Sequence, residues 1–600
     1  MKAIPCLLAI CLAVSCATKN EVSEKIWMAT APAGDQYTAI NRTGVTVLPN
    51  GRFITPLGKQ ITVAPHPFGL MVSPDGKTII TANSGVGPFS ISIITDYNSE
   101  APQVKQIPET LHPEKGLLEA TFMGLAISPD NTKVYVAGGQ QNKIYVFDLK
   151  THKKITEINC HKSFDGTDYS DGYIGDMVLS KDGLRLYAVD QIGFRMMIID
   201  TQTNSILHNV KTGRYPFGIT LSPDEKTVYV ANVGMFEYSY IKTLDRKRLK
   251  ETAAKFPTSA YGSKEMREGV KNDSIEFAGL GDPNVTSKVK TGVLVGEEIE
   301  GISAVGGSSP NSIVATDQFV YVSNGNNDNI SVIDPKQNKV VESIELLLDE
   351  RLKNLKGVIP FGLTLSPDQK RLYVAEAGIN AVGVIDLESG QMVGHIPTGW
   401  FPSKLKVTPD GKQLIVSNAK GYGSGPNGGK DFKPPVDHPY ASYIGALMLG
   451  TVSIIEIPTD DSLKTLTGKV VANNFSFKEI TSTESKNPIP DFPRAKESPI
   501  KYIVFISKEN RTYDEVFGQL QNGKGDSALA HYAKDVSFTN KNKTMKVEHA
   551  TVMPNHLALA EQFAISDNFY VDSDVSADGH VWLTNTYPNQ WMETHHPAAY

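Results

Sequence analysis

The polar stretch SKENRTYDEVFG, residues 507–518, places Glu509, Asn510 and Arg511 side by side after a short apolar run. The carboxylate of Glu509 and the amide oxygen of Asn510 are hard donors of the kind that divalent cations prefer. Further along the chain, Ser576 stands near the start of a predicted helix, where backbone N–H groups and the positive end of the helix dipole suit an incoming phosphate. A serine hydroxyl is a poor nucleophile unless a base or a metal ion lowers its pKa. These residue types therefore indicate metal-assisted chemistry on a phosphate ester.

The elements expected around these residues alternate between strands and helices. Residues 500–506, IKYIVFI, form a continuous apolar run that is typical of a strand covered on both faces, and a helix is predicted to follow in TYDEVFGQL. Residues 554–564 have helical spacing, residues 567–571 are predicted to form a second strand, and the later half of DSDVSADGHVWLTNTY is again predicted to be helical. Such alternation predicts an α/β domain whose ligands lie beyond the carboxyl ends of its strands, where the polar residues named above fall.

At these residues the chain resembles a known family. KENRTYDEVFG, PNHLALAEQFAISDNFY and VSADGH together look like the opening of the phosphoesterase family that contains bacterial phospholipases C and related acid phosphatases, in the alkaline-phosphatase-like superfamily. The resemblance implies metal-dependent attack on a phosphate ester by a Ser or Thr through a phospho-enzyme intermediate. Carried over by motif, Glu509, Asn510 and Ser576 would act at the site of a divalent metal ion, with Ser576 as the nucleophile. His580 and His556 are assigned phosphate contact or leaving-group protonation, and each is equally compatible with a hydrogen-bonded structural histidine.

The segment that carries the expected nucleophile has alternative readings. Asp572, Asp574 and Asp578 would support the metal ion or, alternatively, cap turns and the following helix. DVSADG from Asp574 also has the oxygen-donor spacing of a calcium loop, with Gly579 at the sixth position. The twelfth position, however, is Asn585, where such a loop has a bidentate Glu.

The family's metal site also takes carboxylate and histidine ligands from much later in its fold, and the sequence stops at Tyr600. His595 and His596, almost at the terminus, are poor substitutes for those ligands. We therefore expect a truncated piece of a longer protein or, alternatively, a domain remnant. The full-length protein is expected to hydrolyse ester bonds, and the 600 residues alone are expected to be inactive.

A different pattern fills most of the chain before residue 459. A Gly- or Pro-led apolar strand, a turn of the Ser-Pro-Asp type and a second strand ending near YVAN recur along the chain. Pro pre-sets the turn dihedral, Asp and the residue after it close the turn, and alternating apolar residues make half-buried strands. After most copies a third strand ends in a carboxylate. Six copies keep the turn and a seventh has lost it; they begin at Phe68, Met123, Ile174, Phe217, Phe361, Ser403 and, without the turn, Asn311.

A small sheet of this kind cannot bury both faces alone, so the units are expected to stack radially as propeller blades. The prediction is an all-β seven-bladed β-propeller over residues 41–458, with insertions at about 235–300 and 420–450, followed by the N-terminal part of an α/β alkaline-phosphatase-like domain. Early strands within residues 45–63 are expected to complete the last blade and close the ring.

The repeats resemble the YVTN-type β-propeller family, most clearly at residues 229–232 and 321–324. Some exported bacterial proteins join such a propeller to a phosphoesterase domain, and the chain resembles them over nearly its whole mature length. The repeat predicts the fold and leaves the activity open, because propellers host many activities.

The first residues carry Lys2, an apolar run to Val14 and then Ser15-Cys16. The run is too short for a permanent membrane-spanning helix and is typical of a secretory signal. Its ending, AVSC, looks like a bacterial lipobox with Cys16 as the lipidated residue, and an ordinary cleaved signal is the alternative. We expect an exported lipoprotein of the bacterial cell envelope, in the periplasm or at the surface. The remaining expected divisions are a signal peptide over 1–15, a tether over 16–40, a linker over 459–498 and the phosphoesterase portion over 499–600.

The charge balance argues against nucleic acid as a partner, because 59 basic residues face 65 acidic ones and no dense Lys/Arg stripe appears. The expected partners are a phosphate-ester substrate, a membrane reached through the lipid anchor, and a protein or glycan on a propeller face. The alternative function is a non-enzymatic binding protein, in which the propeller acts and the phosphoesterase segment is a remnant.

Overall fold

The computed structural model describes residues 27–85, 88–109, 116–163, 166–234, 274–279, 285–292, 298–299, 302–303, 308–353, 355–425, 444–480, 487–490, 497–571, 573–585 and 593–595. The chain divides into a smaller unit, Met1–Thr30 with Ser476–Asn510, and a larger unit, Ala31–Phe475 with Arg511–Tyr600. The predicted signal peptide, Cys16, and much of both predicted insertions lie outside the described residues.

The smaller unit contains one antiparallel pair of strands. β1 (Trp27–Thr30) pairs with β34 (Ser476–Glu479). Residues 500–506 form no strand, and Tyr502 and Ile503 are 90% and 88% exposed. The prediction of a strand at residues 500–506 is therefore wrong. A strand must pair its N–H and C=O groups with a neighbour, and this run pairs with none of the described strands.

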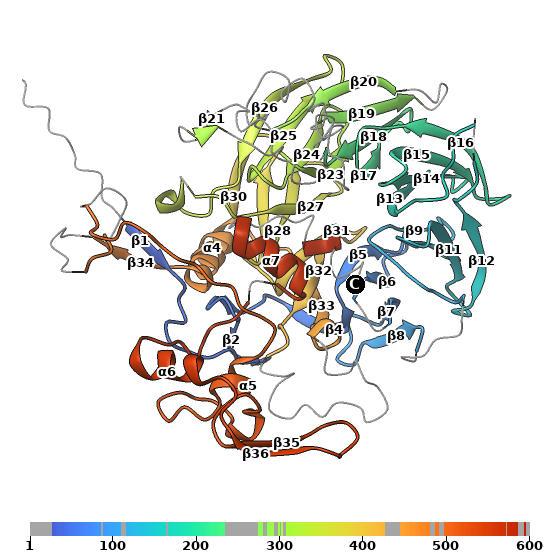
Figure 1. The fold of residues 1–600 in the computed structure, drawn as a ribbon. Coiled ribbons are helices and arrows are strands. Elements are labelled where there is room, and N and C mark those ends of the chain that lie inside the picture. The colour runs from blue at the N-terminus through green and yellow to red at the C-terminus, as the bar shows by residue number, and fades with distance from the viewer. Residues whose placement is uncertain are drawn as a thin grey trace, which may run out of the picture. The chain divides into compact units, whose positions relative to one another are not determined.

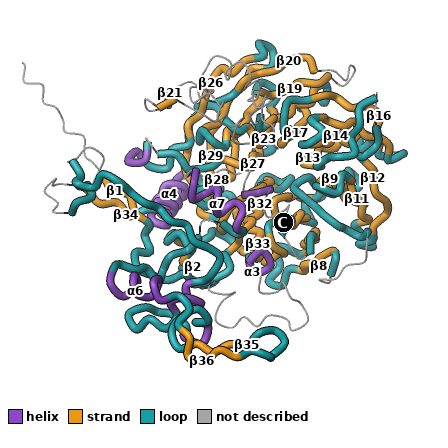
Figure 2. Tube along the Cα trace, in the orientation of Figure 1, coloured by secondary structure: helices purple, strands orange, loops and turns teal. Residues whose placement is uncertain are grey.

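The larger unit is a β-propeller, and its described residues form seven four-stranded antiparallel sheets (Figures 1 and 2). Six of the sheets are blades built from four consecutive strands each. Their strands are β5 (Pro67–Val72), β6 (Ile79–Asn83), β7 (Ser90–Thr95), β8 (Gln103–Ile107); β9 (Leu125–Ile127), β10 (Lys133–Ala137), β11 (Lys143–Asp148), β12 (Lys154–Asn159); β13 (Ile174–Leu179), β14 (Arg185–Asp190), β15 (Arg195–Asp200), β16 (Ser205–Lys211); β17 (Pro216–Leu221), β18 (Thr227–Asn232), β19 (Ser274–Gly279), β20 (Val285–Lys290); β23 (Pro310–Ala315), β24 (Val320–Asn324), β25 (Asn329–Asp334), β26 (Lys339–Glu345); β27 (Pro360–Leu365), β28 (Arg371–Glu376), β29 (Ala381–Asp386) and β30 (Gln391–Pro397).

The remaining four-stranded sheet closes the ring. It consists of β31 (Trp400–Val407), β32 (Gln413–Gly421), β33 (Leu449–Glu456) and, from the start of the chain, β4 (Lys59–Pro65). Inner strands contact one another in a complete circuit, from β5 through β9, β13, β17, β23, β27 and β31 back to β5. Six blades, rather than the predicted seven, are therefore self-contained. The repeat that begins at Ser403 supplies three strands and takes its fourth from β4, which confirms the expected closure of the ring by an early strand.

The Ser-Pro-Asp turn is held by a side-chain hydrogen bond. Ser73 Oγ donates to Asp75 Oδ1 at 2.6 Å and accepts from the N–H of Thr78 at 2.9 Å. Gly76, directly after the aspartate, has φ 70°, a conformation that glycine adopts without steric cost. The motif therefore encodes the tight connection between the first two strands of a blade. The same bond recurs in the other repeats that keep the turn, at Ser128–Asp130, Ser180–Asp182, Ser222–Asp224, Ser366–Asp368 and Thr408–Asp410.

The carboxylates that end the third strands are also structural. Asp148 Oδ1 accepts hydrogen bonds from the N–H groups of Lys150 and Thr151, at 3.0 and 2.6 Å. This side chain fixes the turn into the fourth strand in the manner of an Asx turn. Asp200, Asp334 and Asp386 make the corresponding bonds.

The first half of the predicted linker over 459–498 is a helix instead. α4 (Asp460–Asn474) begins after the N-cap Thr459 and packs on β30. Thr467 Oγ1 accepts a hydrogen bond from the N–H of His395 at 2.9 Å, and Asn474 Nδ2 donates to the carbonyl of Ile379 at 2.8 Å. The polar composition that suggested a linker belongs to the solvent-facing side of this helix.

After residue 510 the larger unit continues with α5 (Tyr513–Phe517), η5 (Ser527–Leu529), β35 (Val536–Thr539), β36 (Lys546–Ala550), α6 (Pro554–Gln562) and α7 (Ser576–Asn585). The three helices predicted in this region are confirmed. Residues 567–571, predicted as a strand, form none, and β35 pairs with β36 alone. The described residues therefore do not show the expected alkaline-phosphatase-like sheet, since neither of its predicted strands has a partner.

The smaller elements are β2 (Thr46–Val47), β3 (Phe53–Ile54), β21 (Glu298–Ile299), β22 (Ile302–Ser303), η3 (Glu350–Leu352) and α3 (Ile444–Leu447). Among the described residues, no helix combines the length and the apolar character needed to cross a membrane.

Close packing of the inner strands yields a first prediction. A Cβ atom on Gly362 of β27 would stand 2.3 Å from the carbonyl oxygen of Ser403 on β31. Gly362→Ala is therefore expected to lower the free energy of unfolding by about 1–3 kcal/mol, because the neighbouring backbone must shift. Gly468→Ala is the matched control: Gly468 lies inside α4 with open space around it, so the same change is expected to stabilise by about 0.5–1 kcal/mol. Urea unfolding measures both, and effects of the same sign would contradict the prediction.

The turn motif yields a second prediction, on pH. The hydrogen bond from Ser73 lowers the pKa of Asp75. A carboxyl group whose pKa folding lowers stabilises the native state above its unfolded pKa, near about 4, and this contribution is lost as the pH falls through the folded value. Ser73→Ala is expected to lower the free energy of unfolding by about 1 kcal/mol at neutral pH, and the difference from the native protein should shrink below about pH 4. Denaturant unfolding at a series of pH values checks this; a difference that does not change with pH would contradict it.

Candidate functional site

Ser576 is the first residue of α7, and its side chain is exposed. His580 lies four residues later on the same helix and is also exposed, so the two side chains share one helix face. His556 is the third residue of α6 and is half-buried. Helix α7 therefore brings the expected nucleophile and one of the two candidate histidines together, whereas the other histidine belongs to a separate helix.

Glu509 and Asn510 are exposed and end the smaller unit, whereas Ser576 belongs to the larger one. In the part of the chain that the structure describes, no group of three or more His, Cys, Asp or Glu side chains is arranged to hold a metal ion. The residues present therefore fit only part of the predicted divalent-metal site.

The residue two positions before Ser576 is buried in an ion cluster with the propeller. Asp574 Oδ2 lies 3.1 Å from Lys420 Nζ, on β32, and 3.2 Å from His66 Nε2, between β4 and β5. Lys420 Nζ also donates a hydrogen bond to Glu593 Oε2 at 2.7 Å. The four side chains are at most 7% exposed. We call these residues, His66, Lys420, Asp574 and Glu593, the buried ion cluster.

Charge compensation inside the buried ion cluster is mutual. Burial raises the pKa of Asp574, but the charges and hydrogen bonds of Lys420 and His66 together outweigh burial and hold that pKa well below its usual range. Burial likewise opposes the charge of Lys420, and the two carboxylates outweigh it and raise the pKa of the lysine. Burial and the negative charge of Asp574 raise the pKa of Glu593, against the attraction of Lys420. One cation thus holds two carboxylates that flank α7.

Five phenylalanines, on or directly before the inner strands of different sheets, form a closed circuit where these strands begin. Successive ring centroids in this aromatic circuit are 5.9–6.4 Å apart, and the members are Phe68, Phe122, Phe217, Phe361 and Phe401. His595 lies against it, with its ring centroid 4.9 Å from that of Phe122, and its Nε2 is 2.7 Å from Gln191 Oε1. Helix α7 lies beside β31 and β32 in Figure 1. The described residues 573–585 and 593–595 therefore dock on this end of the propeller.

Sequence reasoning missed His66 and Lys420. Both precede Asp574 by more than 150 residues and belong to the predicted propeller, so no local spacing connects them to it. The sequence signal was weak, a lysine at the end of the strand pattern QLIVSNA, and the structure shows this lysine to be only 4% exposed. A charge is rarely buried in a strand unless a partner compensates it.

The calcium-loop alternative for residues 574–585 is corrected by the structure. Residues 576–585 are helical, and the side chain of Asp574 is held by Lys420 and His66. Asp578, in the first turn of α7, is 1% exposed, and neither of its carboxylate oxygens has a hydrogen-bond partner among the described residues. Asp572 and His596 lie outside the described residues.

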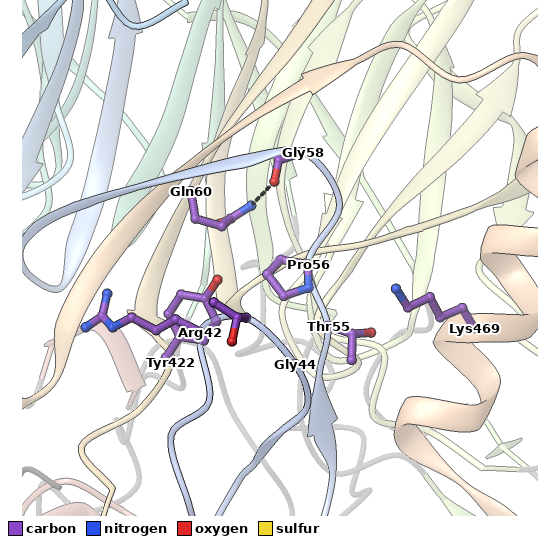
Figure 3. A pocket seen from close by; sticks show the side chains of 9 residues that line it. Arg42, Gly44, Thr55, Pro56, Gly58, Gln60, Tyr422 and Lys469 are labelled. Carbon is purple, nitrogen blue, oxygen red and sulfur yellow. Dashed lines mark hydrogen bonds between the residues drawn. The ribbon is translucent and has the colours of Figure 1, made fainter. Parts of the chain in front are cut away.

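A second candidate site is a pocket of about 400 Å³ on the larger unit (Figure 3). Arg42 and Lys469 are among its lining residues, and no Asp or Glu lines it. The Arg42 guanidinium lies over the ring of Tyr422, at 5.3 Å from the centroid, and donates a hydrogen bond to Thr62 Oγ1 at 2.8 Å. Gln60 adds a carboxamide to the lining. Two cations around a polar cavity suit a small anion.

Comparisons with known proteins give partial similarities and do not establish a family for the chain. No family model matches it. Antigen Lp49 of Leptospira interrogans serogroup Icterohaemorrhagiae serovar copenhageni (strain Fiocruz L1-130) is 24% identical over 330 residues, and the match covers 51% of this chain and 57% of Lp49. The chain therefore matches little more than half the length of this curated relative. Among solved structures, Kuenenia stuttgartiensis hydrazine synthase is similar with 18% identity and a TM-score of 0.42, over 59% of this chain and 93% of that one. What is established of this chain is a β-propeller.

Proposed function

We propose that the chain is part of an exported hydrolase of phosphate esters in which Ser576 is the nucleophile and the propeller binds substrate, surface or partner. The observation that carries the proposal is the exposed Ser576 at the first position of a ten-residue helix, within the motif VSADGH. The amides of the first turn of a helix and its dipole favour a phosphate at that point. KENRTYDEVFG supplies the second motif of the same resemblance.

In the proposed reaction, the hydroxyl of Ser576 gives up its proton to solvent water, and Oγ attacks phosphorus while the bond from phosphorus to the ester oxygen breaks. The leaving alcohol takes a proton from a histidine, for which His580 and His556 are the candidates, and water then hydrolyses the phosphoserine to release phosphate. A bound divalent ion would lower the pKa of the serine hydroxyl, and Glu509 and Asn510 offer oxygen donors for it. Because the described residues fit only part of such a site, no step is assigned to the ion.

The place of action proposed is the bacterial cell envelope. This part of the proposal is supported by the apolar N-terminal run and by Cys16 after AVS. Lipidation of Cys16 would anchor the protein to a membrane, where phosphate esters of lipids, nucleotides and small metabolites are all accessible substrates.

The proposal predicts that Ser576→Ala abolishes hydrolysis. The protein encoded by the whole reading frame is assayed with an aryl phosphate and divalent ions, and the variant is expected to lose at least about 10³-fold in kcat/KM. Ser527→Ala, an exposed serine in η5, is the matched control and should retain full activity. Chelation should abolish the native activity and added divalent ions should restore it. Unchanged turnover in Ser576→Ala would contradict the assignment.

The second candidate function is non-enzymatic binding by the propeller, and the cationic pocket is the observation that favours it. Arg42 and Lys469 both line this pocket, and no Asp or Glu is among its lining residues to compete with an anionic ligand. The ligand class is a small anion such as inorganic phosphate or a sulfate ester.

This candidate is tested by titration calorimetry with inorganic phosphate at low ionic strength. Arg42→Ala and Lys469→Ala are each expected to weaken binding roughly tenfold, as expected for loss of one charge-assisted contact. Lys464→Ala, an exposed lysine on the same helix α4 that does not line the pocket, is the control. Absence of binding to the native protein, or equal weakening by the control, would exclude the pocket.

A further inference from the structure

We propose that His66 and Lys420 of the propeller are positioning residues for the segment that carries Ser576. The propeller would then hold the first turn of α7 in place, in addition to any binding role of its own. The catalytic part of the inference rests on the proposed function, whereas the docking part does not.

Helix α7 is held to the propeller on both sides. Asp574, two residues before Ser576, contacts Lys420 and His66. Beyond the far end of the helix, Glu593 contacts the same lysine, and Trp582 Nε1 on the helix donates a hydrogen bond to Glu593 Oε1 at 3.0 Å. One side chain of the closing sheet thus ties down both flanks of the helix.

The contacts of Lys420 with Asp574 and Glu593 are buried, although Ser576 is exposed. Two carboxylates removed from water are stable only beside a compensating cation, and Lys420 is the cation that contacts both. The ammonium group also lies 5.2 Å from the ring centroid of Trp400, which packs it from the strand side. The contacts of Asp574 with Lys420 and His66 therefore fix the backbone directly before Ser576, and the Ser576 hydroxyl stays exposed to solvent.

The side chain of Lys420 is not part of the strand pairing that closes the ring. Lys420 lies on β32, whose pairing with β33 and the addition of β4 are made by backbone hydrogen bonds that do not involve its side chain. Replacement of the lysine is therefore expected to release residues 573–585 and 593–595 from the propeller while the propeller ring stays closed.

The test compares Lys420→Met, which removes the charge and keeps most of the side-chain length, with Lys420→Arg and with Lys412→Met. Lys412 is a matched control because its side chain is 77% exposed at the turn of the same sheet. Hydrogen–deuterium exchange is measured on the full-length protein, together with kcat and KM for an aryl phosphate. Lys420→Met is expected to speed exchange in residues 573–585 at least tenfold with exchange in the blades unchanged, and to lower kcat with little change in KM. Lys420→Arg is expected to restore part of both.

The two readouts separate the two proposals. Unchanged exchange in 573–585, or an equal rise throughout the blades, would overturn the positioning role whatever the activity. If the native protein hydrolyses no phosphate ester, the proposed function fails and the exchange result still decides whether the propeller holds this segment. Asp574→Asn approaches the same contact from the other side; it is expected to speed exchange in the same residues, and it keeps the test valid if Lys420→Met does not fold. A double variant should show less than the sum of the two single effects, because both remove the same contact.

Discussion

A propeller blade buries its two faces only against the blades beside it, so the constraint on which this structure depends is the closure of the ring. Closure is made by β4, which adds to β33 and completes a sheet begun by β31 and β32. The inner strands then contact one another in an unbroken circuit, and the glycines on them allow the backbones to approach closely. Because the two ends of the propeller meet in one sheet, the loss of β4 would expose a sheet edge and an apolar face together.

The same closing sheet carries the contact that ties the propeller to the C-terminal segment. Lys420 lies on β32 and His66 follows β4, so ring closure brings both to one place. A buried lysine with two buried carboxylates is stable only in that arrangement, since any one of the charges left alone would be costly in a low-dielectric interior. The candidate nucleophile, two residues from Asp574, is therefore placed by a contact made in the propeller and not by its own local sequence.

Much of the propeller was predictable, because its repeat depends on interactions between residues that are close in sequence. The Ser73 to Asp75 bond and the left-handed Gly76 are properties of a few neighbouring residues, and they recur with the motif. Helices α5, α6 and α7 were predictable for the same reason. The strands expected at residues 500–506 and 567–571 failed, because an apolar run is compatible with a strand but needs a partner to become one. The prediction of a linker over residues 459–498 missed helix α4, because this helix packs on β30 and composition does not reveal that packing.

The sequence by itself determined the repeat, the turn geometry and the residue types at Glu509, Asn510 and Ser576, since each depends on neighbours along the chain. Tertiary structure alone decided that Asp574 is held by His66 and Lys420, and that residues 500–506 and 567–571 pair with no described strand. The physical reason is that hydrogen bonding in a turn is local, whereas burial of a charge depends on which distant partner the closed fold places beside it.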